Sequence, residues 1–422
     1  MNLKIISLIL IFAMCFSMFA ACKDTSSGQI ELVVVSPFDV DDSNHENYVN
    51  AYKSYEEASN VKINDKSKAS DEVWKQSVLK SFEDGTEPDV LFFFTGADAN
   101  DFVKDKKVVS ITEIRSEYPD YASNMRDAML PVSNYDGRQY ALPVNGYWEG
   151  LFVNKKVLAD CGIEIPGADY TWEQFIIDCT IIKDKGYTPI ACSLNAIPHY
   201  WFEFCVFNNG SIVDHTNIPK SSDDKIADKW IKAFDDIKNL YDKGFFPEST
   251  TTMTDDEACN LMVENKAAFL LEGSWKVGWF QKNTENIDDF TVTYVPAKGN
   301  RRATDIVAGL SMGYYISRKA WNDPKKREAC VKFITAMTTD EVVNSFGSIV
   351  ITALKNGTTP LENADILSTD ALEMTKNCTG IVSAAQDGLS VNSRNALFDD
   401  VKNIVTGKIT SKDAIDKCLK IE

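Results

Sequence analysis

Short apolar runs alternate with amphipathic stretches along the chain. The run IELVVVSPF (30–38) is rich in β-branched residues and predicts a buried strand. The segment 71–82 predicts a helix capped by Ser70, and the apolar run 88–94 predicts the next buried strand. A strand, a helix and a strand in this order favour a right-handed parallel crossover. We therefore expect an α/β sheet whose ligands bind beyond the carboxyl ends of its strands.

The same alternation continues towards the C-terminus. We expect apolar strands within 136–144, 150–158, 189–195, 265–275 and 308–320, and helices within 171–186, 223–247 and 324–337. Capping patterns mark two helix starts, Thr171 with Gln174 and Asp323 with Pro324. Residues 284–306 are polar and irregular, which indicates a connector. No repeat or long linker divides the sequence. Any domains must therefore be joined by a chain that crosses between them more than once.

Length and charge narrow the function. The chain has 422 residues, enough for about two or three domains without crosslinks. Its 62 acidic residues outnumber 44 basic ones, and the formal net charge is −18. This charge argues against a nucleic-acid partner, because binding phosphates requires clustered Lys and Arg. A neutral or cationic ligand fits the charge better.

Residues 1–21 have the pattern of an export signal. A basic start and a short apolar run lead to small residues before Cys22. The alternative is a membrane anchor, but the run is short for a spanning helix. FAAC resembles the bacterial lipobox, whose cysteine carries lipid, although Phe19 departs from the usual aliphatic residue. We expect a signal peptide at 1–21, lipid on Cys22 and a polar tether at 22–29.

The ten cysteines do not form a recognisable pattern. Eight remain after removal of the signal and lipidation of Cys22, and no two have the C-x-x-C spacing. Cys179 and Cys330 lie in apolar helix-like runs, where a thiol packs as a small hydrophobe. We interpret most of the eight as buried free thiols. The three histidines are scattered, so we expect no metal site and no cofactor.

The order of several segments is more informative than any one of them. The segments are EPDVLFFF, DGRQYALPV, NKKVLADCGIEIP, TWEQF, ENKAAFLLEGSW, GLSMGYYISRK and DPKKREACVKFITAMTTDE. Together they resemble the extracellular solute-binding proteins of ABC transporters, most closely the sugar-binding family 1. The resemblance covers about residues 30–420. It implies a two-lobed, type II periplasmic-binding-protein-like α/β fold with the ligand cleft between lobes joined by several hinge crossings.

The resemblance also implies how the chain is divided. The N-terminal lobe would comprise 28–144 plus 305–347, and the C-terminal lobe 145–304 plus 348–422. The crossings near Val144, Asp305 and Ser348 would form the hinge.

Candidate ligand-binding residues follow from the needs of a sugar, which presents apolar C–H faces and many hydroxyls. Trp275 is the first candidate, because the family carries an aromatic residue there and Gly273 permits a sharp turn; its alternative role is core packing. The remaining candidates from the C-terminal lobe follow predicted strand ends: Asn145, Tyr147, Trp148, Glu149, His199 and Tyr200. Only alternate residues of 145–149 can face the cleft if the segment is extended.

The N-terminal lobe and the returning strand supply the other candidates. Those that follow the first strands are Phe38, Asp39, Asp41, Thr95, Gly96 and Asp98. Gly309, Ser311 and Met312 would approach the ligand through their backbone. Arg394 is a more remote candidate, chosen because arginine is scarce in this chain.

The resemblance implies capture without chemistry. A monomeric receptor, anchored through lipid to the outer face of the cell membrane, would close on a mono- or oligosaccharide and deliver it to ABC permease subunits served by a separate ATPase. The chain has no G-x-x-x-x-G-K-[ST] motif of its own. Three alternatives remain open from sequence: a surface-anchored carbohydrate-active enzyme, an adhesin or wall scaffold, and a receptor for a non-sugar solute such as a polyamine. Inward acids such as Asp39, Asp98 and Glu149 keep the polyamine possible.

Overall fold

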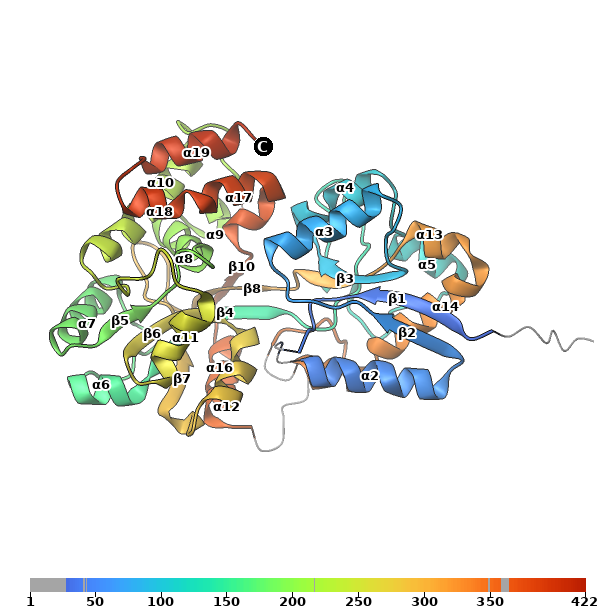
Figure 1. Cartoon of the computed structure of the whole chain (residues 1–422), viewed down its shortest axis with the longest axis horizontal. Coiled ribbons are helices and arrows are strands. Elements are labelled where there is room, and N and C mark those ends of the chain that lie inside the picture. The colour runs from blue at the N-terminus through green and yellow to red at the C-terminus, as the bar shows by residue number, and fades with distance from the viewer. Residues whose placement is uncertain (1–27, 41, 43, 216, 348–349, 358–363) are drawn as a thin grey trace, which may run out of the picture.

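Two α/β lobes lie side by side, each built on its own sheet (Figure 1). The structure, a computed structural model, describes residues 28–422 except 41, 43, 216, 348–349 and 358–363. The predicted signal peptide, Cys22 and the candidate Asp41 lie outside the described residues. No described helix is both long and apolar enough to cross a bilayer.

The first sheet has the strand order β2-β1-β3-β9. β1 (Ile30–Val35) pairs in parallel with β2 (Val61–Asp65) and with β3 (Val90–Phe94), whereas β9 (Met312–Ile316) is antiparallel to β3. The helices of this lobe are α2 (His45–Ala58), α3 (Glu72–Glu83), α4 (Asn100–Lys104), α5 (Ile111–Glu117), α13 (Arg318–Asn322), α14 (Pro324–Met337) and α15 (Asp340–Gly347). Apolar clusters fill both faces of the sheet, as expected for parallel strands covered by helices.

The second sheet has the order β10-β8-β4-β6-β5, with β7 also paired to β4. Its strands are β4 (Tyr147–Asn154), β5 (Thr188–Ala191), β6 (Ala267–Gly273), β7 (Phe290–Thr293), β8 (Asp305–Gly309) and β10 (Gly380–Val382). Its helices are α6 (Lys155–Cys161), α7 (Trp172–Asp184), α8 (His199–Asn209), α9 (Ile212–His215), α10 (Lys225–Asp242), α11 (Asp255–Val263), α12 (Val277–Asn283), α16 (Ile366–Lys376), α17 (Val391–Asp399), α18 (Val401–Val405) and α19 (Ser411–Leu419). Large apolar clusters again lie on the two faces.

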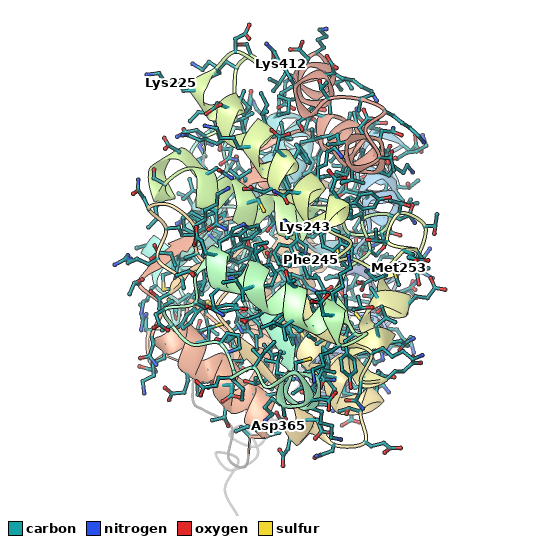
Figure 2. All side chains as sticks on the ribbon, turned by 90° about the vertical axis from the view of Figure 1, so that its left-hand side faces the viewer. Lys225, Lys243, Phe245, Met253, Asp365 and Lys412 are labelled. Carbon is teal, nitrogen blue, oxygen red and sulfur yellow. The ribbon has the colours of Figure 1, made fainter. Side chains whose placement is uncertain are left out.

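The outer side of the second lobe is covered by amphipathic helices. Figure 2 views this side, where Lys225 and Lys243 mark the two ends of α10. The apolar side of α10 is buried at Trp230, Phe234 and Ile237. Its opposite side carries charged side chains, and this division explains why the helix lies flat on the lobe.

Local sequence signals located most elements but not their exact limits. Asp323 caps α14 with Pro324 at its first position, as predicted. Asp71, rather than Ser70, caps α3, because its Oδ1 accepts the backbone N–H of Trp74 at 2.7 Å. The predicted strand at 136–144 is wrong; this segment makes only isolated bridges, such as Leu142 with Tyr314.

Three further elements differ from the prediction. The polar region 284–306, interpreted as a connector, contains the buried strand β7 and the start of β8. The helix α2 and the strand β2 were missed, so the first crossover is in fact two crossovers. β8 pairs with β4 and β10, which places residues 305–309 in the second lobe instead of the first. The chain re-enters the first lobe only at β9.

The cysteines behave as small packing residues. All eight cysteines of the described chain are free thiols, and seven of them are buried. Cys179 and Cys205 lie inside the main core of the second lobe. The interpretation of the eight as unpaired packing residues is confirmed for this part of the chain.

Candidate functional site

The two lobes meet where the chain crosses between them. Gly146, at the first crossing, donates its N–H to the carbonyl of Ile351 at 2.8 Å. At the second crossing, the backbone N–H and the Oγ1 of Thr95 both donate to the carbonyl of Ser311, at 2.7 and 3.1 Å. Tyr147 pairs with Gly309 just inside the second lobe. Thr95, Gly309 and Ser311, predicted as ligand contacts, thus surround the crossings.

Aromatic rings from three elements come together beside these crossings. The ring of Trp275 lies 6.2 Å from that of Tyr147 and 5.8 Å from that of Tyr200, and His199 contacts Tyr200 at 4.5 Å between centroids. All four side chains are half-buried. We call Tyr147, His199, Tyr200 and Trp275 the aromatic wall. The structure therefore brings together four residues that the sequence had only suggested separately.

Gly273 and Glu272 fix the position of Trp275. A Cβ on Gly273 would lie 2.2 Å from the indole ring, so only glycine leaves room for the tryptophan there. The role predicted for Gly273, a sharp turn, is wrong, because its backbone is extended with φ −103°. Glu272 Oε2 accepts the indole N–H of Trp275 at 2.8 Å and the N–H of Gly273 at 2.9 Å. The buried carboxyl group of Glu272 therefore fixes the orientation of the indole ring.

A pair of buried carboxyl groups lies next to the wall. Glu149, on β4, and Glu203, on α8, are 3% and 0% exposed. Gln386 donates its amide N–H to Glu203 Oε1, and no described donor reaches Oε2 of either glutamate. Burial raises the pKa of Glu149 far above its usual value, and burial raises the pKa of Glu203 to about 8. The two side chains hydrogen-bond to each other, which requires that one carries a proton.

A second charged group joins the lobes. Arg394, on α17 of the second lobe, contacts Asp98 at 2.7 Å and Glu72 at 3.2 Å, both from the first lobe. Lys75 contacts the same two acids at 3.4 and 2.9 Å. Figure 1 shows α17 against α3, where this contact forms. We call Glu72, Lys75, Asp98 and Arg394 the cross-lobe group.

Nearby titratable groups report the same environment. Asp387 lies in the turn Ala385–Gly388, which precedes α17. It faces Arg394 and Lys75, yet burial raises its pKa to about 6. Burial lowers the pKa of His199 to about 3, so its ring is neutral at physiological pH. The first lobe thus brings Lys75 with the two acids Glu72 and Asp98, and the second lobe brings Arg394 with several acids.

Several predicted site residues lie elsewhere. Phe38 is wrong as a cleft residue, because it packs in the first core against Tyr48, Phe92 and Phe346. Trp148 is also wrong: it alternates with Tyr147 on β4 and is fully buried on the opposite face.

The other candidates are close to the cleft in different roles. Asp98 does not offer a free carboxylate, because Arg394 and Lys75 hold it. Met312 packs against the first core, Gly96 lies near the carbonyl of Asp387, and Asn145 and Asp39 are half-buried next to the predicted strand ends.

Sequence reasoning missed four acceptor residues of the second lobe, Glu203, Glu272, Gln386 and Asp387. One signal was present: Glu203 is the single charge in the otherwise apolar stretch WFEFCVF of α8. A carboxylate in such a stretch is rarely buried without a function.

One cluster has the composition of a metal site. Ligand atoms of Asp255, Cys259 and Glu272 lie within 4.8 Å of one another. The ammonium of Lys276 contacts Asp255 at 2.5 Å and therefore already supplies a positive charge there. Coulombic contact with Glu272 and Cys259 raises the pKa of Lys276 in spite of its burial. The cluster fits a lysine-neutralised support for Glu272 better than a metal centre.

Solved structures with the same arrangement cover almost the whole chain. A chitin oligosaccharide binding protein matches with a TM-score of 0.78 at 20% identity, over 93% of this chain and 98% of its own. The bacterial solute receptor AcbH, described as preferring β-D-galactopyranose, matches with a TM-score of 0.75 at 16% identity, over 93% and 98%. An ABC substrate-binding protein from Listeria monocytogenes in complex with cycloalternan matches with a TM-score of 0.72 at 16% identity, over 93% and 98%. These likenesses confirm the predicted two-lobed α/β fold.

Sequence comparison identifies the family directly. None of the curated protein sequences matches the chain. The profile of the bacterial extracellular solute-binding proteins, however, matches residues 41–344, which is well over half of the chain. With its two lobes and its cleft-side aromatic wall, this chain belongs to the bacterial extracellular solute-binding protein family.

Proposed function

We propose that the protein captures a carbohydrate between its lobes and delivers it to an ABC importer. As a member of a solute-binding family it is a receptor and not an enzyme, so the carbohydrate-active enzyme is no longer retained as an alternative. One observation carries the proposal: the aromatic wall stands next to buried, unpartnered oxygens of Glu149, Glu203 and Gln386. Flat rings suit C–H faces, and the oxygens accept hydrogen bonds from hydroxyls.

Similar structures support the same ligand class. Three of them are described with chitin oligosaccharide, β-D-galactopyranose and cycloalternan as their ligands, all of them carbohydrates. Their identity to this chain is 20% or less, so the choice of sugar rests on the residues of this cleft alone.

Closure would occur at the crossings. We place two hinge segments at residues 144–146 and 310–311. A third hinge segment follows Gly347, and part of it lies outside the described residues. Arg394 bridges to the first lobe, so separation of the lobes would break its contacts with Asp98 and Glu72. The ligand and the cross-lobe group would then favour closure together.

Delivery would take place at the membrane surface. Cleavage after residue 21 and lipid on Cys22 would tether the receptor outside the cell, next to its permease subunits and their separate ATPase. Metabolic labelling with a radioactive fatty acid tests the anchor. Label should enter the wild type and not Cys22→Ser; equal labelling of the variant would contradict a lipid at this position.

A thermal-shift screen tests the function. The purified protein is heated with mono- and oligosaccharides and, separately, with polyamines. Binding stabilises the folded state by an amount that grows with the logarithm of ligand concentration over Kd, so a sugar ligand should raise the Tm. Product analysis of the same mixtures should show the sugar unchanged. A shift with polyamines alone, or turnover of a sugar, would overturn the proposal.

A further inference from the structure

The buried and half-buried ionisable side chains around the aromatic wall and the cross-lobe group are mostly acids. Among the described residues there, seven are acids and three are bases: Glu72, Asp98, Glu149, Glu203, Asp255, Glu272 and Asp387 against Lys75, Lys276 and Arg394. Lys75 and Arg394 are held by Glu72 and Asp98, and Lys276 is held by Asp255. The excess of acid therefore falls on the second lobe.

Within that excess, Glu149 and Glu203 have no cation as a contact. Apart from the proton that the two carboxyl groups share, their Oε2 atoms and the Oε1 of Gln386 are buried and receive no hydrogen bond from any described donor. The three residues are at most 4% exposed. They come from β4, α8 and the turn Ala385–Gly388, so the acceptors converge from separate elements. Gln386 is uncharged, and its orphaned oxygen is evidence for a missing donor that does not depend on the acidic cluster.

The acceptors match an ammonium group in number and charge. A primary ammonium has three N–H donors and no acceptor, which corresponds to three unpartnered oxygens. A hydroxyl has a single donor and would satisfy only one of these oxygens, whereas an ammonium supplies a cation in contact that allows both carboxyl groups to ionise.

The surroundings favour a sugar as the carrier of that ammonium. Both Tyr147 and Tyr200, from the aromatic wall, lie close enough to Glu149 and Glu203 for the acids to raise their pKa. Trp275 contacts both tyrosines. Flat rings accept the C–H face of a pyranose and also attract a cation. A flexible polyamine has no flat face to cover this wall.

We propose that the second-lobe side of the cleft binds an amino sugar, with its protonated primary amine held by Glu149, Glu203 and Gln386. This inference rests on the proposed carbohydrate function and specifies its ligand class.

Binding of the ammonium releases a proton. The free pair holds one proton between two carboxyl groups; the incoming cation favours the doubly ionised pair, and the proton passes to solvent. Other groups facing the pair are Tyr147 on its own strand, Tyr200 on α8, Glu272 on β6 and Asp387 beside Gln386. The acids among them oppose ionisation of the free pair, and so they strengthen the release on binding.

Calorimetry with matched sugars tests the inference. Glucosamine, N-acetylglucosamine and glucose, and their β-1,4-linked dimers, differ only in the group on C2. We expect the free amines to bind at least about tenfold more tightly than the hydroxyl and acetamide forms. Titrations in two buffers of different ionisation enthalpy should show net proton release at pH 7 with the amines only. The same comparison is made among galactosamine, N-acetylgalactosamine and galactose. Spermidine is titrated as the polyamine alternative.

Isosteric variants identify the responsible residues. Glu149→Gln and Glu203→Gln should reduce the amine-to-hydroxyl affinity ratio towards one and abolish proton release. Glu285→Gln is the control, because it removes one negative charge from an exposed position of the same lobe. Circular dichroism and the Tm establish that each variant is folded. If a glutamine variant does not fold, proton release by the wild type still decides.

Each outcome separates the inference from the function it rests on. Equal or better binding of the neutral sugars, without proton release, would overturn the amino-sugar inference and leave the carbohydrate function standing. Binding of spermidine alone, or of no sugar in the set or in the wider screen, would overturn both.

Discussion

Two groups of buried charge lie on either side of the same cleft. The cross-lobe group joins two cations to two acids, and the contacts of Arg394 run between the lobes. The pair Glu149 and Glu203 belongs to the second lobe only and has no cation in contact. Balanced charges that span a boundary favour one arrangement of the lobes, whereas an unbalanced pair inside one lobe favours a bound partner. Burial alone thus does not indicate what a charged residue does.

The largest expected effect tests whether the wall next to the unbalanced pair is a binding surface. Trp275→Ala should weaken sugar binding by on the order of a hundredfold, because a large aromatic contact is lost. The apo Tm should change little, since Trp275, unlike Trp279, does not pack against the described apolar core clusters. Trp279→Ala is the matched control: it packs against Phe280, so it should lower the Tm and retain binding. Collapse of apo stability in Trp275→Ala would mean that this residue is part of the core.

The pH dependence of apo stability tests the unbalanced pair itself. The folded pKa of Glu203 is raised from 4.5 to about 8, so the folded protein retains a proton that the unfolded chain releases. Stability should therefore fall between about pH 4.5 and 8, by on the order of 5 kcal/mol, and level off above. Glu272 and Asp387, with pKa values raised to about 8 and 6, act in the same direction.

Glu203→Gln should flatten this profile. Its Tm should exceed that of the wild type at pH 8 and approach it at pH 5, as measured by calorimetry across the range. A wild-type stability that rises with pH over this interval would contradict a shared proton.

Removal of the central cation tests the balanced group. Arg394→Met leaves Asp98 and Glu72 with only Lys75, and the lobes can open to hydrate them. The apo protein should show a larger radius of gyration by small-angle X-ray scattering, and ligand affinity should fall by about tenfold as the closed population declines. Lys412→Met, which removes an exposed contact with Asp223, should change neither value. An unchanged radius for Arg394→Met would show that the cross-lobe contacts do not favour closure.

The smallest expected effect concerns Glu272, which holds Trp275 of the aromatic wall in place. Glu272→Gln retains the shape of the acceptor for the indole N–H of Trp275 but removes its charge. Binding should weaken about threefold, with a shift in tryptophan fluorescence, because the platform is less firmly held. A loss as large as that of Trp275→Ala would assign Glu272 a direct contact with the ligand instead.

The sequence predicted the aromatic wall better than it predicted the cross-lobe group. His199, Tyr200 and Trp275 follow strand ends and Tyr147 begins β4, whose antiparallel pairing with β6 brings its first residues next to the end of β6. The ion pair between Asp98 and Arg394 joins residues 296 positions apart, and no local pattern indicates it. Arg394 was chosen only for its rarity.

Errors in the predicted strands and site also have physical causes. β7 escaped detection because threonines alternate with apolar residues in a polar context, and all four of its residues are nevertheless buried against β4 and α16. Trp148 was accepted beside Tyr147 because sequence gives the alternation of a strand without telling which face meets the cleft. β8 and β9 read as one strand, and only pairing shows that they belong to different sheets.

The separation of β8 from β9 determines when the first lobe can fold. β9 is the antiparallel edge of the first sheet, and α14, which follows it, packs on β1 and α2. Neither exists until more than 300 residues of the chain have been made. The N-terminal third of the molecule therefore cannot complete its core early in synthesis, although N-terminal domains generally fold first. Such a delay would keep the N-terminal part unfolded enough to pass through a translocation pore during the proposed export. The native fold would form only after the last third of the chain has followed.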